Sequence, residues 1–414
     1  MLRMRESDWL DKAEIETDTA SYLLILLARP HLNATQSGVA KQLADTIEDW
    51  DRFIKTCGER FILPFALKHL QAIQANLPAE TVMNARQATF QVASDSLRLL
   101  AAQQKFHKTC VEPVNAPHLY LKGLTLAAQY YGQVGVRRCR DIDVFVEGPL
   151  YDVVLQRALD QGYQLLLSPT LWKFAETPEE FDFARRFQDV ISLITPEHVH
   201  IELHRRIETA TGIFDGIMPH IQPDPVVINN VTYQTMPLPW LFNYVVLHHS
   251  RHFWSHLHWL ADIDAMASHP TFDRDETLVL ARKLGIEPTV AAALEMNNWS
   301  KDPRTWPKNL SSTNGGRFLK LAIFNLTGDD EAEHFLQSEA VMGQFIGKWQ
   351  LSPALMQTAW SRWIGRSVKP HVAQWQANPK PPSLYWMYKL ENILRLIGTV
   401  VLSLILGVRT PRRR

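Results

Sequence analysis

The sequence is poor in cysteine and has no excess of charge of either sign. Its 414 residues include three cysteines, Cys57, Cys110 and Cys139, and no two of them form a CxxC pair. An odd number of cysteines without such spacing excludes a disulfide framework and a zinc ribbon, and it favours a reducing compartment. The 43 basic and 43 acidic residues cancel. This balance makes nucleic acid an unlikely partner, because nucleic-acid-binding surfaces need clustered Lys and Arg.

Apolar segments long enough for a signal peptide or a membrane span are also lacking. The N-terminal stretch, residues 1–8, has no apolar core, so we expect a cytoplasmic protein. Near the other end, residues 396–408 are mostly apolar and are followed by an arginine-rich tail, but a bilayer span needs about 20 residues. A helix packed on the protein is the leading interpretation of this segment. Peripheral membrane contact through the helix and a partner interface are the alternatives.

The chain divides by pattern into three ranges, as expected for a length beyond one hydrophobic core. Residues 1–112 read as a helical N-terminal region, with few glycines and apolar positions at helical spacing. From about Pro117, short β-rich runs alternate with helices, which is typical of an α/β or α+β unit, placed at 113–232. After Pro237 to Pro239 the pattern returns to helices, which gives a helical C-terminal region at 233–414.

Within the central range the sequence predicts a small set of strands and helices. A hairpin is indicated by the turn Thr195-Pro196-Glu197 between two apolar runs. In its second run Val199, Ile201 and Leu203 fall on one face, and His198, His200, Glu202 and His204 fall on the other. The predicted elements are strand 140–146, helix 150–161, strand 163–167, a helix or loop at 176–187, and hairpin strands 189–194 and 198–204.

Two aspartates interrupt the apolar strand at 140–146. Asp141 and Asp143 share one face, while Ile142 and Val144 face the other way. Aspartate is depleted in strands, and a pair of them is costly unless it is solvated or bound to a cation. Mg²⁺ is usually held by one or two carboxylates together with substrate phosphates, so the strand suits a nucleoside triphosphate. Glu202 supplies a possible third carboxylate, and an exposed strand edge is the alternative.

Lys122 and Gly123 precede a predicted helix that runs to about Tyr131. Backbone N–H groups at a helix start, together with an ammonium group, favour anions such as phosphate. A purely structural loop is the alternative for so short a motif.

Histidines give a competing interpretation. His248 and His252 lie four residues apart on a predicted helix, and His200 and His204 flank Glu202. Zinc binding, substrate or second-layer contacts, and structural packing all remain open for these histidines, although no HExxH signature is present.

The order of these motifs resembles the uncharacterised nucleotidyltransferase family of the DNA polymerase beta superfamily. The likeness extends over about residues 117–270. Its motifs are Leu121-Lys122-Gly123, Arg137, Asp141-Ile142-Asp143, Gly162-Tyr163, Ile201-Glu202-Leu203-His204, and the helix from His248 to Trp254 with Leu257, Trp259 and Asp262.

The resemblance implies an α+β fold with a small mixed-sheet core flanked by helical regions. It implies Asp141, Asp143 and Glu202 as catalytic ligands of two Mg²⁺ ions, with Glu202 alternatively the general base. Nucleotide contacts are expected from Lys122, Gly123, Arg137, His204, His248 and His252.

The implied reaction is attack of an acceptor hydroxyl on the α-phosphorus of a nucleoside triphosphate, with release of pyrophosphate. The acceptor would be an unknown small molecule, sugar or peptide. The wider superfamily has Gly-Ser where this chain has Gly123-Leu124. That difference motivates a second hypothesis, a catalytically silent nucleotide-binding or regulatory protein on the same fold. A third is a toxin-like nucleotidyltransferase acting on RNA, which would require a basic groove.

Overall fold

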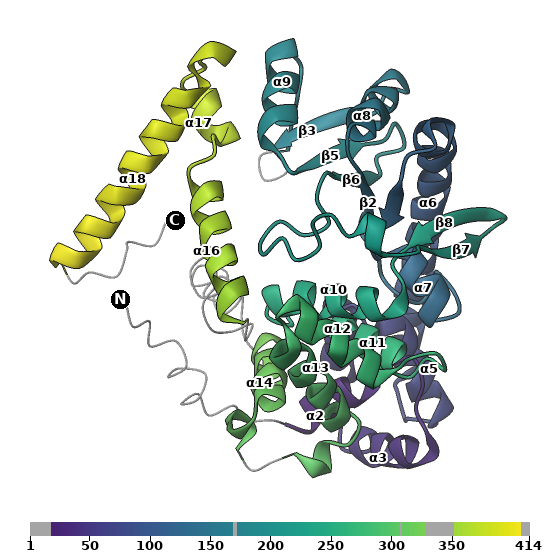
Figure 1. Ribbon diagram of the computed structural model, residues 1–414. Coiled ribbons are helices and arrows are strands. Elements are labelled where there is room, and N and C mark those ends of the chain that lie inside the picture. Colours follow the sequence, from purple (N-terminus) through teal and green to yellow (C-terminus); the bar gives the residue numbers. More distant parts are fainter. Residues whose placement is uncertain (1–17, 169–171, 307–308, 328–351, 407–414) are drawn as a thin grey trace. The chain divides into compact units, whose positions relative to one another are not determined.

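The structure, a computed structural model, describes residues 18–168, 172–306, 309–327 and 352–406 (Figure 1). The helical expectation at 8–17 and the arginine-rich tail at 409–414 lie outside the described residues. Contacts between residues group the chain into two units that are each discontinuous in sequence. The first unit draws on Met1–Gln104, Leu119–Ile142 and Ile221–Ser352, and the second on Lys105–His118, Asp143–His220 and Pro353–Arg414. The division at 112 and 232 therefore stays a prediction.

Helices dominate the first unit, as the spacing of apolar residues predicts. Several begin at side-chain caps, such as Asn33, whose Oδ1 accepts a hydrogen bond from the Gln36 amide at 2.8 Å. The helices are α2 (Thr19–Leu27), α3 (Ala34–Ala44), α4 (Trp50–Glu59), α5 (Leu63–Ala72), α6 (Ala79–Phe106), α7 (Leu124–Tyr130), α10 (Leu238–Arg251), α11 (His258–Ala267), α12 (Arg274–Leu284), α13 (Glu287–Ser300) and α14 (Asn314–Thr327).

A buried arginine fastens the first described helix to helices more than 200 residues later. Arg29, at the end of α2, donates to the backbone oxygen of Ser300 and lies 3.5 Å from the carboxylate of Asp264. Its own backbone oxygen is 2.8 Å from Nε2 of His69 on α5. Since Arg29 is almost fully buried, these contacts replace the water that the guanidinium loses on folding.

A hairpin in the first unit was not predicted from the sequence. Strands β7 (Asp224–Ile228) and β8 (Val231–Thr235) pair antiparallel, and β7 packs beside α7 (Figure 1). Asn229 and Asn230 link them with φ of 47° and 62°. Consecutive left-handed residues are typical of a type I′ turn, for which asparagine is well suited. The Asn-Asn pair between β-branched residues was the overlooked signal.

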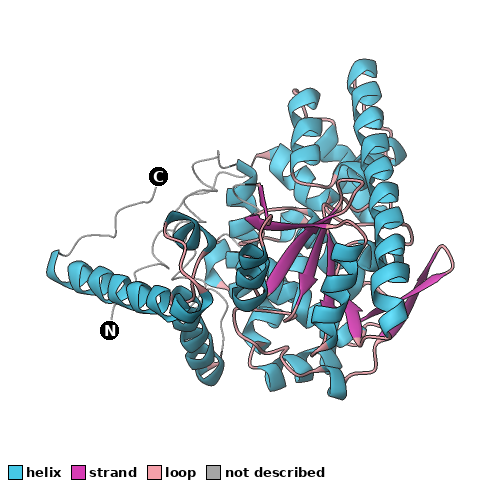
Figure 2. Ribbon diagram, turned by 90° about the horizontal axis from the view of Figure 1, so that it is seen from above, coloured by secondary structure: helices cyan, strands magenta, loops and turns pink. Residues whose placement is uncertain are grey.

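A six-stranded mixed sheet forms the centre of the fold, with strand order β1-β2-β6-β5-β3-β4. The magenta arrows of Figure 2 show its strands side by side. Strands β3, β5 and β6 pair antiparallel, and β5 with β6 is the predicted hairpin. The strands are β1 (His118–Tyr120), β2 (Ile142–Val146), β3 (Gln164–Ser168), β4 (Lys173–Phe174), β5 (Val190–Ile194) and β6 (His200–His204). The predicted α+β class is confirmed.

The helices of the second unit include two that accompany this sheet. These are α8 (Leu150–Asp160) and α9 (Pro178–Phe187), which lie near β3 and β5 in Figure 1. Thr177 and Glu180 form a capping box at the start of α9, so the acidic stretch left open as helix or loop is a helix. Beyond residue 352 the unit continues with α16 (Pro353–Ser367), α17 (Val372–Ala377) and α18 (Tyr385–Leu406).

The three cysteines are buried and unbonded, as expected. In the part of the chain that the structure describes, no helix has both the length and the apolar character that a membrane crossing requires.

Candidate metal and nucleotide site

The acidic strand places a buried carboxylate in the second unit. Every residue of β2 is buried, and Asp143 is only 3% exposed. On β6, Ile201 and Leu203 are fully buried, whereas Glu202 remains partly accessible. The predicted alternation of an apolar face and a chemical face in this strand is confirmed. Burial of a carboxylate is costly without a compensating charge, so the partners of Asp143 define the chemistry of the site.

His204 supplies that compensation. Its Nε2 lies 3.2 Å from Oδ1 of Asp143 and 3.4 Å from Oε2 of Glu202. Burial alone would lower the pKa of His204, but the two carboxylates more than offset burial and raise its pKa to about 9. At neutral pH without a metal, an imidazolium therefore lies between the two acids, in the position where a cation is needed.

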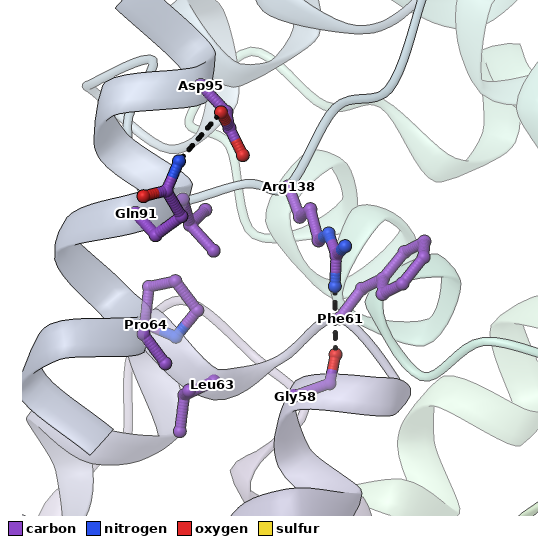
Figure 3. A pocket seen from close by; sticks show the side chains of 9 residues that line it. Gly58, Phe61, Leu63, Pro64, Gln91, Asp95 and Arg138 are labelled. Carbon is purple, nitrogen blue, oxygen red and sulfur yellow. Dashed lines mark hydrogen bonds between the residues drawn. The ribbon is translucent and has the colours of Figure 1, made fainter. Parts of the chain in front are cut away.

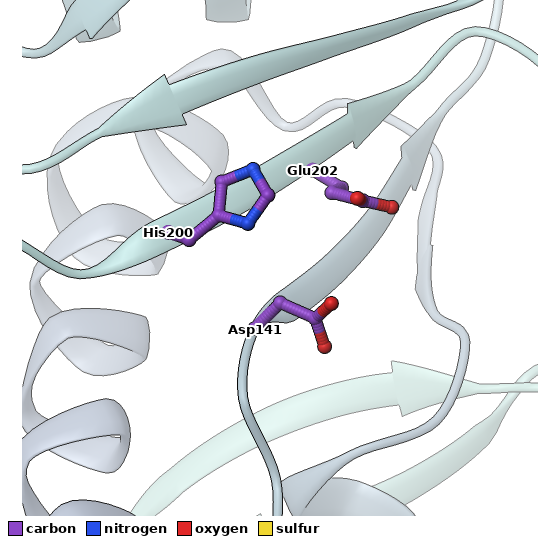
Figure 4. Close-up of side chains that lie close together, drawn as sticks. All are labelled: Asp141, His200 and Glu202. Atoms are coloured by element: carbon purple, nitrogen blue, oxygen red, sulfur yellow. The ribbon is translucent and has the colours of Figure 1, made fainter. Parts of the chain in front are cut away.

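Two groups of side chains around this point could hold metal ions. The first group is Asp143, Glu202 and His204, and the second is Asp141, His200 and Glu202. In each group the candidate ligand atoms all lie within 4.8 Å of one another. Figure 4 shows the second group, with Asp141 just before β2 and the two other residues on the neighbouring strand β6.

The donor set fits a divalent cation. Glu202 belongs to both groups. Each group offers two carboxylates and one imidazole. Mg²⁺ prefers oxygen ligands. Mn²⁺ accepts an imidazole ligand more readily than Mg²⁺ does, although zinc and copper bind imidazole more strongly than either. Sequence reasoning left zinc binding open for His200 but did not include it in the nucleotidyltransferase site, although its position two residues before Glu202 on the chemical face was the available signal.

The Lys122-Gly123 loop belongs to the first unit. Gly123 is the N-cap of α7 and has φ of 70°, a conformation that side chains rarely adopt. A Cβ atom there would lie 3.7 Å from the backbone oxygen of Asp141. The loop thus passes beside the backbone of the first aspartate, and the predicted helix start is confirmed.

A buried chain of side chains extends from Lys122 into the first unit. Lys122 Nζ lies 3.2 Å from Nε2 of His248, and Nδ1 of His248 lies 3.2 Å from Nδ1 of His249. Nε2 of His249 lies 3.2 Å from Oδ2 of Asp262. One tautomer set satisfies all three contacts. Lys122 donates to His248, His248 donates to His249, and His249 donates to Asp262.

The pKa values agree with these neutral tautomers. Burial is the main reason that the pKa of His248 lies well below its usual value, and the charge of Lys122 lowers it further. Burial likewise lowers the pKa of His249, to about 4, although Asp262 opposes the shift. Both rings are therefore uncharged at neutral pH, and each has one nitrogen that can accept a hydrogen bond.

Arg137 closes this chain at Asp262. Its Nε and Nη2 donate to the two carboxylate oxygens at 2.7 and 2.8 Å, and Tyr131 donates to Oδ1 at 2.8 Å. Burial alone would raise the pKa of Asp262, but Arg137 and His249 hold it well below its usual range. Because the Nε–Nη2 edge of the guanidinium faces Asp262 and Nη1 donates to Sγ of Cys139 at 3.3 Å, a phosphate contact by Arg137 would compete with these bonds. The phosphate role of Arg137 stays a prediction.

The remaining candidate residues lie on or near the same helix. The His252 ring is 4.8 Å from the His248 ring and 5.7 Å from Trp259. Neither histidine belongs to a group that could hold a metal among the residues described. Trp254 and Trp259 are buried, as aromatic residues at helical spacing usually are.

A separate pocket of about 210 Å³ opens beside the segment that carries Arg138 (Figure 3). Phe61, Pro64 and Gln91 contribute to its lining. Arg138 donates to the backbone oxygen of Gly58 at 3.4 Å and lies over the Phe61 ring. Since ligand pockets usually measure about 300–1,000 Å³, this pocket is too small for a whole nucleoside triphosphate.

Taken together, these observations define an α+β protein with a mixed sheet and a cluster of carboxylates and imidazoles that could hold a metal ion. A model of the family described as uncharacterised nucleotidyltransferase matches residues 46–299, more than half of the chain. The chain belongs to this family. No curated protein matches it significantly.

The Arg137–Asp262 pair can be tested by unfolding. Asp262→Asn leaves the Arg137 guanidinium buried without a counter-charge, and we expect the free energy of unfolding to fall by about 3–5 kcal/mol. The double variant Arg137→Met with Asp262→Leu should lose less than Asp262→Asn alone, because no buried charge remains. Urea titration measures both. Asp275→Asn, at an exposed position of α12, is the matched control, and equal stability of Asp262→Asn and this control would contradict the interpretation.

The buried histidines predict a loss of stability in acid. Burial keeps the pKa of His249 at about 4 and that of His258 well below its usual value. Below about pH 6.5 the unfolded chain binds protons that the folded histidines do not, so stability falls as the pH drops from about 6.5 toward 4. His258→Phe preserves the ring and removes one such site. Its unfolding free energy should therefore fall less between pH 7 and pH 5 than that of the unsubstituted protein. Parallel pH dependences would contradict this account.

Proposed function

We propose that this protein is a divalent-metal-dependent nucleotidyltransferase that transfers a nucleoside monophosphate from a nucleoside triphosphate to an acceptor hydroxyl. A bond forms between the acceptor oxygen and the α-phosphorus, the bond from the α-phosphorus to the bridging oxygen breaks, and pyrophosphate leaves. The observation that carries the proposal is the convergence of Asp143, Glu202 and His204 in a chain of this family. The acceptor we favour is a small molecule, sugar or peptide.

The proposed ligands of the metal ions are Asp141, Asp143 and Glu202, with Mg²⁺ as the working ion. Such ions would neutralise phosphate charge and orient the attacking and leaving oxygens. Asp143 is rigid because β2 is fully buried, and it would hold its ligand oxygen in place. Glu202 is more accessible, with its side chain 30% exposed. It is therefore the better placed of the two to receive the proton of the acceptor hydroxyl.

Contacts to the triphosphate are proposed for Lys122 and Gly123 on the basis of the family resemblance. The hydrogen bond from Lys122 to His248 would restrict the ammonium group to one direction and lower the entropy that phosphate binding costs. Through His248, the residues His249 and Asp262 act as positioning residues for Lys122. His252 is proposed as a further contact at the nucleotide.

A catalytically silent nucleotide-binding protein is the second candidate, and one observation favours it. The His204 imidazolium already lies between Asp143 and Glu202 and offsets one of their two negative charges, so the cluster has a counter-charge without a metal ion. The two candidates differ in whether a divalent ion displaces the proton of His204.

Transfer activity should depend on the carboxylates of the second unit. Asp143→Asn and Glu202→Gln each remove charge that would hold the metal ions, and we expect at least about a 100-fold loss of pyrophosphate release from labelled nucleoside triphosphates. A mixture of sugars, peptides and small alcohols serves as the acceptor pool. Asp152→Asn, on exposed α8 and paired with Arg185, is the matched control with unchanged activity. If both variants release pyrophosphate as fast as the control, catalysis at this site is wrong.

Metal choice should follow the imidazole ligand. By calorimetry we expect Mn²⁺ to bind more tightly than Mg²⁺, because His204 adds a nitrogen donor. Binding of both ions should strengthen from pH 7 to pH 9, since a ligating imidazole must lose its proton. His204→Asn should weaken Mn²⁺ binding more than Mg²⁺ binding, and the exposed His220→Asn should change neither. Absence of binding by either ion at pH 9 would support the silent candidate instead.

A further inference from the structure

The last described helix, α18, is packed through its polar groups. Tyr385, Tyr388 and Asn392 are its buried residues, and the Tyr388 hydroxyl accepts a hydrogen bond from the Lys380 amide at 2.9 Å while donating to the Asn378 oxygen. The Asn392 side chain donates to the Lys369 oxygen at 2.8 Å. Hydrogen bonds therefore fix which face of α18 points inward.

The aliphatic face of the same helix points outward. Trp386, Leu390, Ile393, Leu394 and Ile397 are each 40–60% exposed. Their spacing of three or four residues places them on one side of the helix, which we call the α18 apolar stripe. A surface helix normally buries such a stripe, so its exposure indicates a binding surface.

We propose that the α18 apolar stripe docks this protein on a membrane surface that contains anionic lipids. The helix would lie in the plane of the interface, with the stripe in the boundary between headgroups and acyl chains. The proposal does not depend on the transferase activity. It adds a surface contact to a chain whose described helices are not suited to crossing a bilayer.

The charge of the C-terminal sequence favours an anionic membrane as the binding partner of the stripe. After Glu391 the sequence carries five arginines and neither aspartate nor glutamate. Each basic residue near an anionic leaflet adds electrostatic attraction. Stable surface binding usually requires two signals, and an apolar stripe followed by a basic segment supplies both.

The aromatic end of the stripe agrees with a lipid interface. Trp386 is exposed in the first turn of α18, and tryptophan is enriched at membrane surfaces because its ring is apolar while its N–H can remain hydrated. The segment that follows Ile397 in the sequence continues to be mainly aliphatic, so the apolar character extends beyond the stripe.

The test is co-sedimentation of the full chain with vesicles. We compare vesicles of phosphatidylcholine alone with an equal mixture of phosphatidylcholine and phosphatidylserine. The protein should bind the mixed vesicles and bind less at high salt, because salt screens the arginines. The double variant Leu394→Glu with Ile397→Glu should bind at least about tenfold more weakly, since it lacks two aliphatic side chains that would be buried in the membrane on docking.

Val153→Glu is the matched control, because it places the same charge at an exposed apolar position of α8 in the same unit. Its vesicle binding should be unchanged. Melting temperatures of all variants are measured in parallel.

Four outcomes would overturn the proposal. One is that the unsubstituted protein does not bind mixed vesicles. Another is that the double variant binds as well as the control. The third is that the unsubstituted protein forms a dimer and does not bind vesicles, while the double variant is monomeric. That result would assign the stripe to contact with a second copy of the chain. A large fall in melting temperature confined to the double variant would show that the chain itself covers the stripe.

Discussion

The buried ion pair between Arg137 and Asp262 is the constraint on which the first unit depends. It joins the segment after α7 to α11, and the same carboxylate receives Tyr131 and His249. Arg29 and Asp264 make a second contact of this kind on α11. Removing one partner of a buried ion pair destabilises a protein far more than the intact pair stabilises it. Because Arg137 lies four residues before Asp141, the pair also limits where the acidic strand can begin.

The buried aspartates of the two units have different counter-charges. Asp262 faces an arginine, which cannot lose its proton, so its charge is permanently compensated. Asp143 faces His204, a group that can lose its proton. A divalent cation could therefore take the place of the His204 proton beside Asp143. Beside Asp262, the Arg137 guanidinium has no proton that a cation could displace. This difference in counter-charge separates a structural carboxylate from a candidate metal ligand more clearly than burial does.

Much of the local structure follows from patterns in the sequence. Alternation of His200, Glu202 and His204 with Ile201 and Leu203 predicted the two faces of β6, and the structure confirms them. The turn Thr195-Pro196-Glu197 predicted the pairing of β5 with β6. Where local signals were overlooked, as with Asn229 and Asn230, the hairpin β7–β8 was missed. The apolar run at 396–408 predicted a C-terminal helix packed on the protein, but it did not indicate which face of α18 is exposed.

The sequence by itself determined the order of elements, the acidic strand and the family, because periodicity and motif spacing act over a few residues. Only the tertiary structure decided the partner of each buried charge. Arg137 pairs with a carboxylate 125 positions later, and His204 lies between Asp143 and Glu202. Ion pairs form between charged groups that the fold buries next to one another. The spacing of residues in the sequence does not identify these partners. The outward apolar face of α18 has the same origin, since hydrogen bonds of Tyr388 and Asn392 to distant backbone fix its rotation.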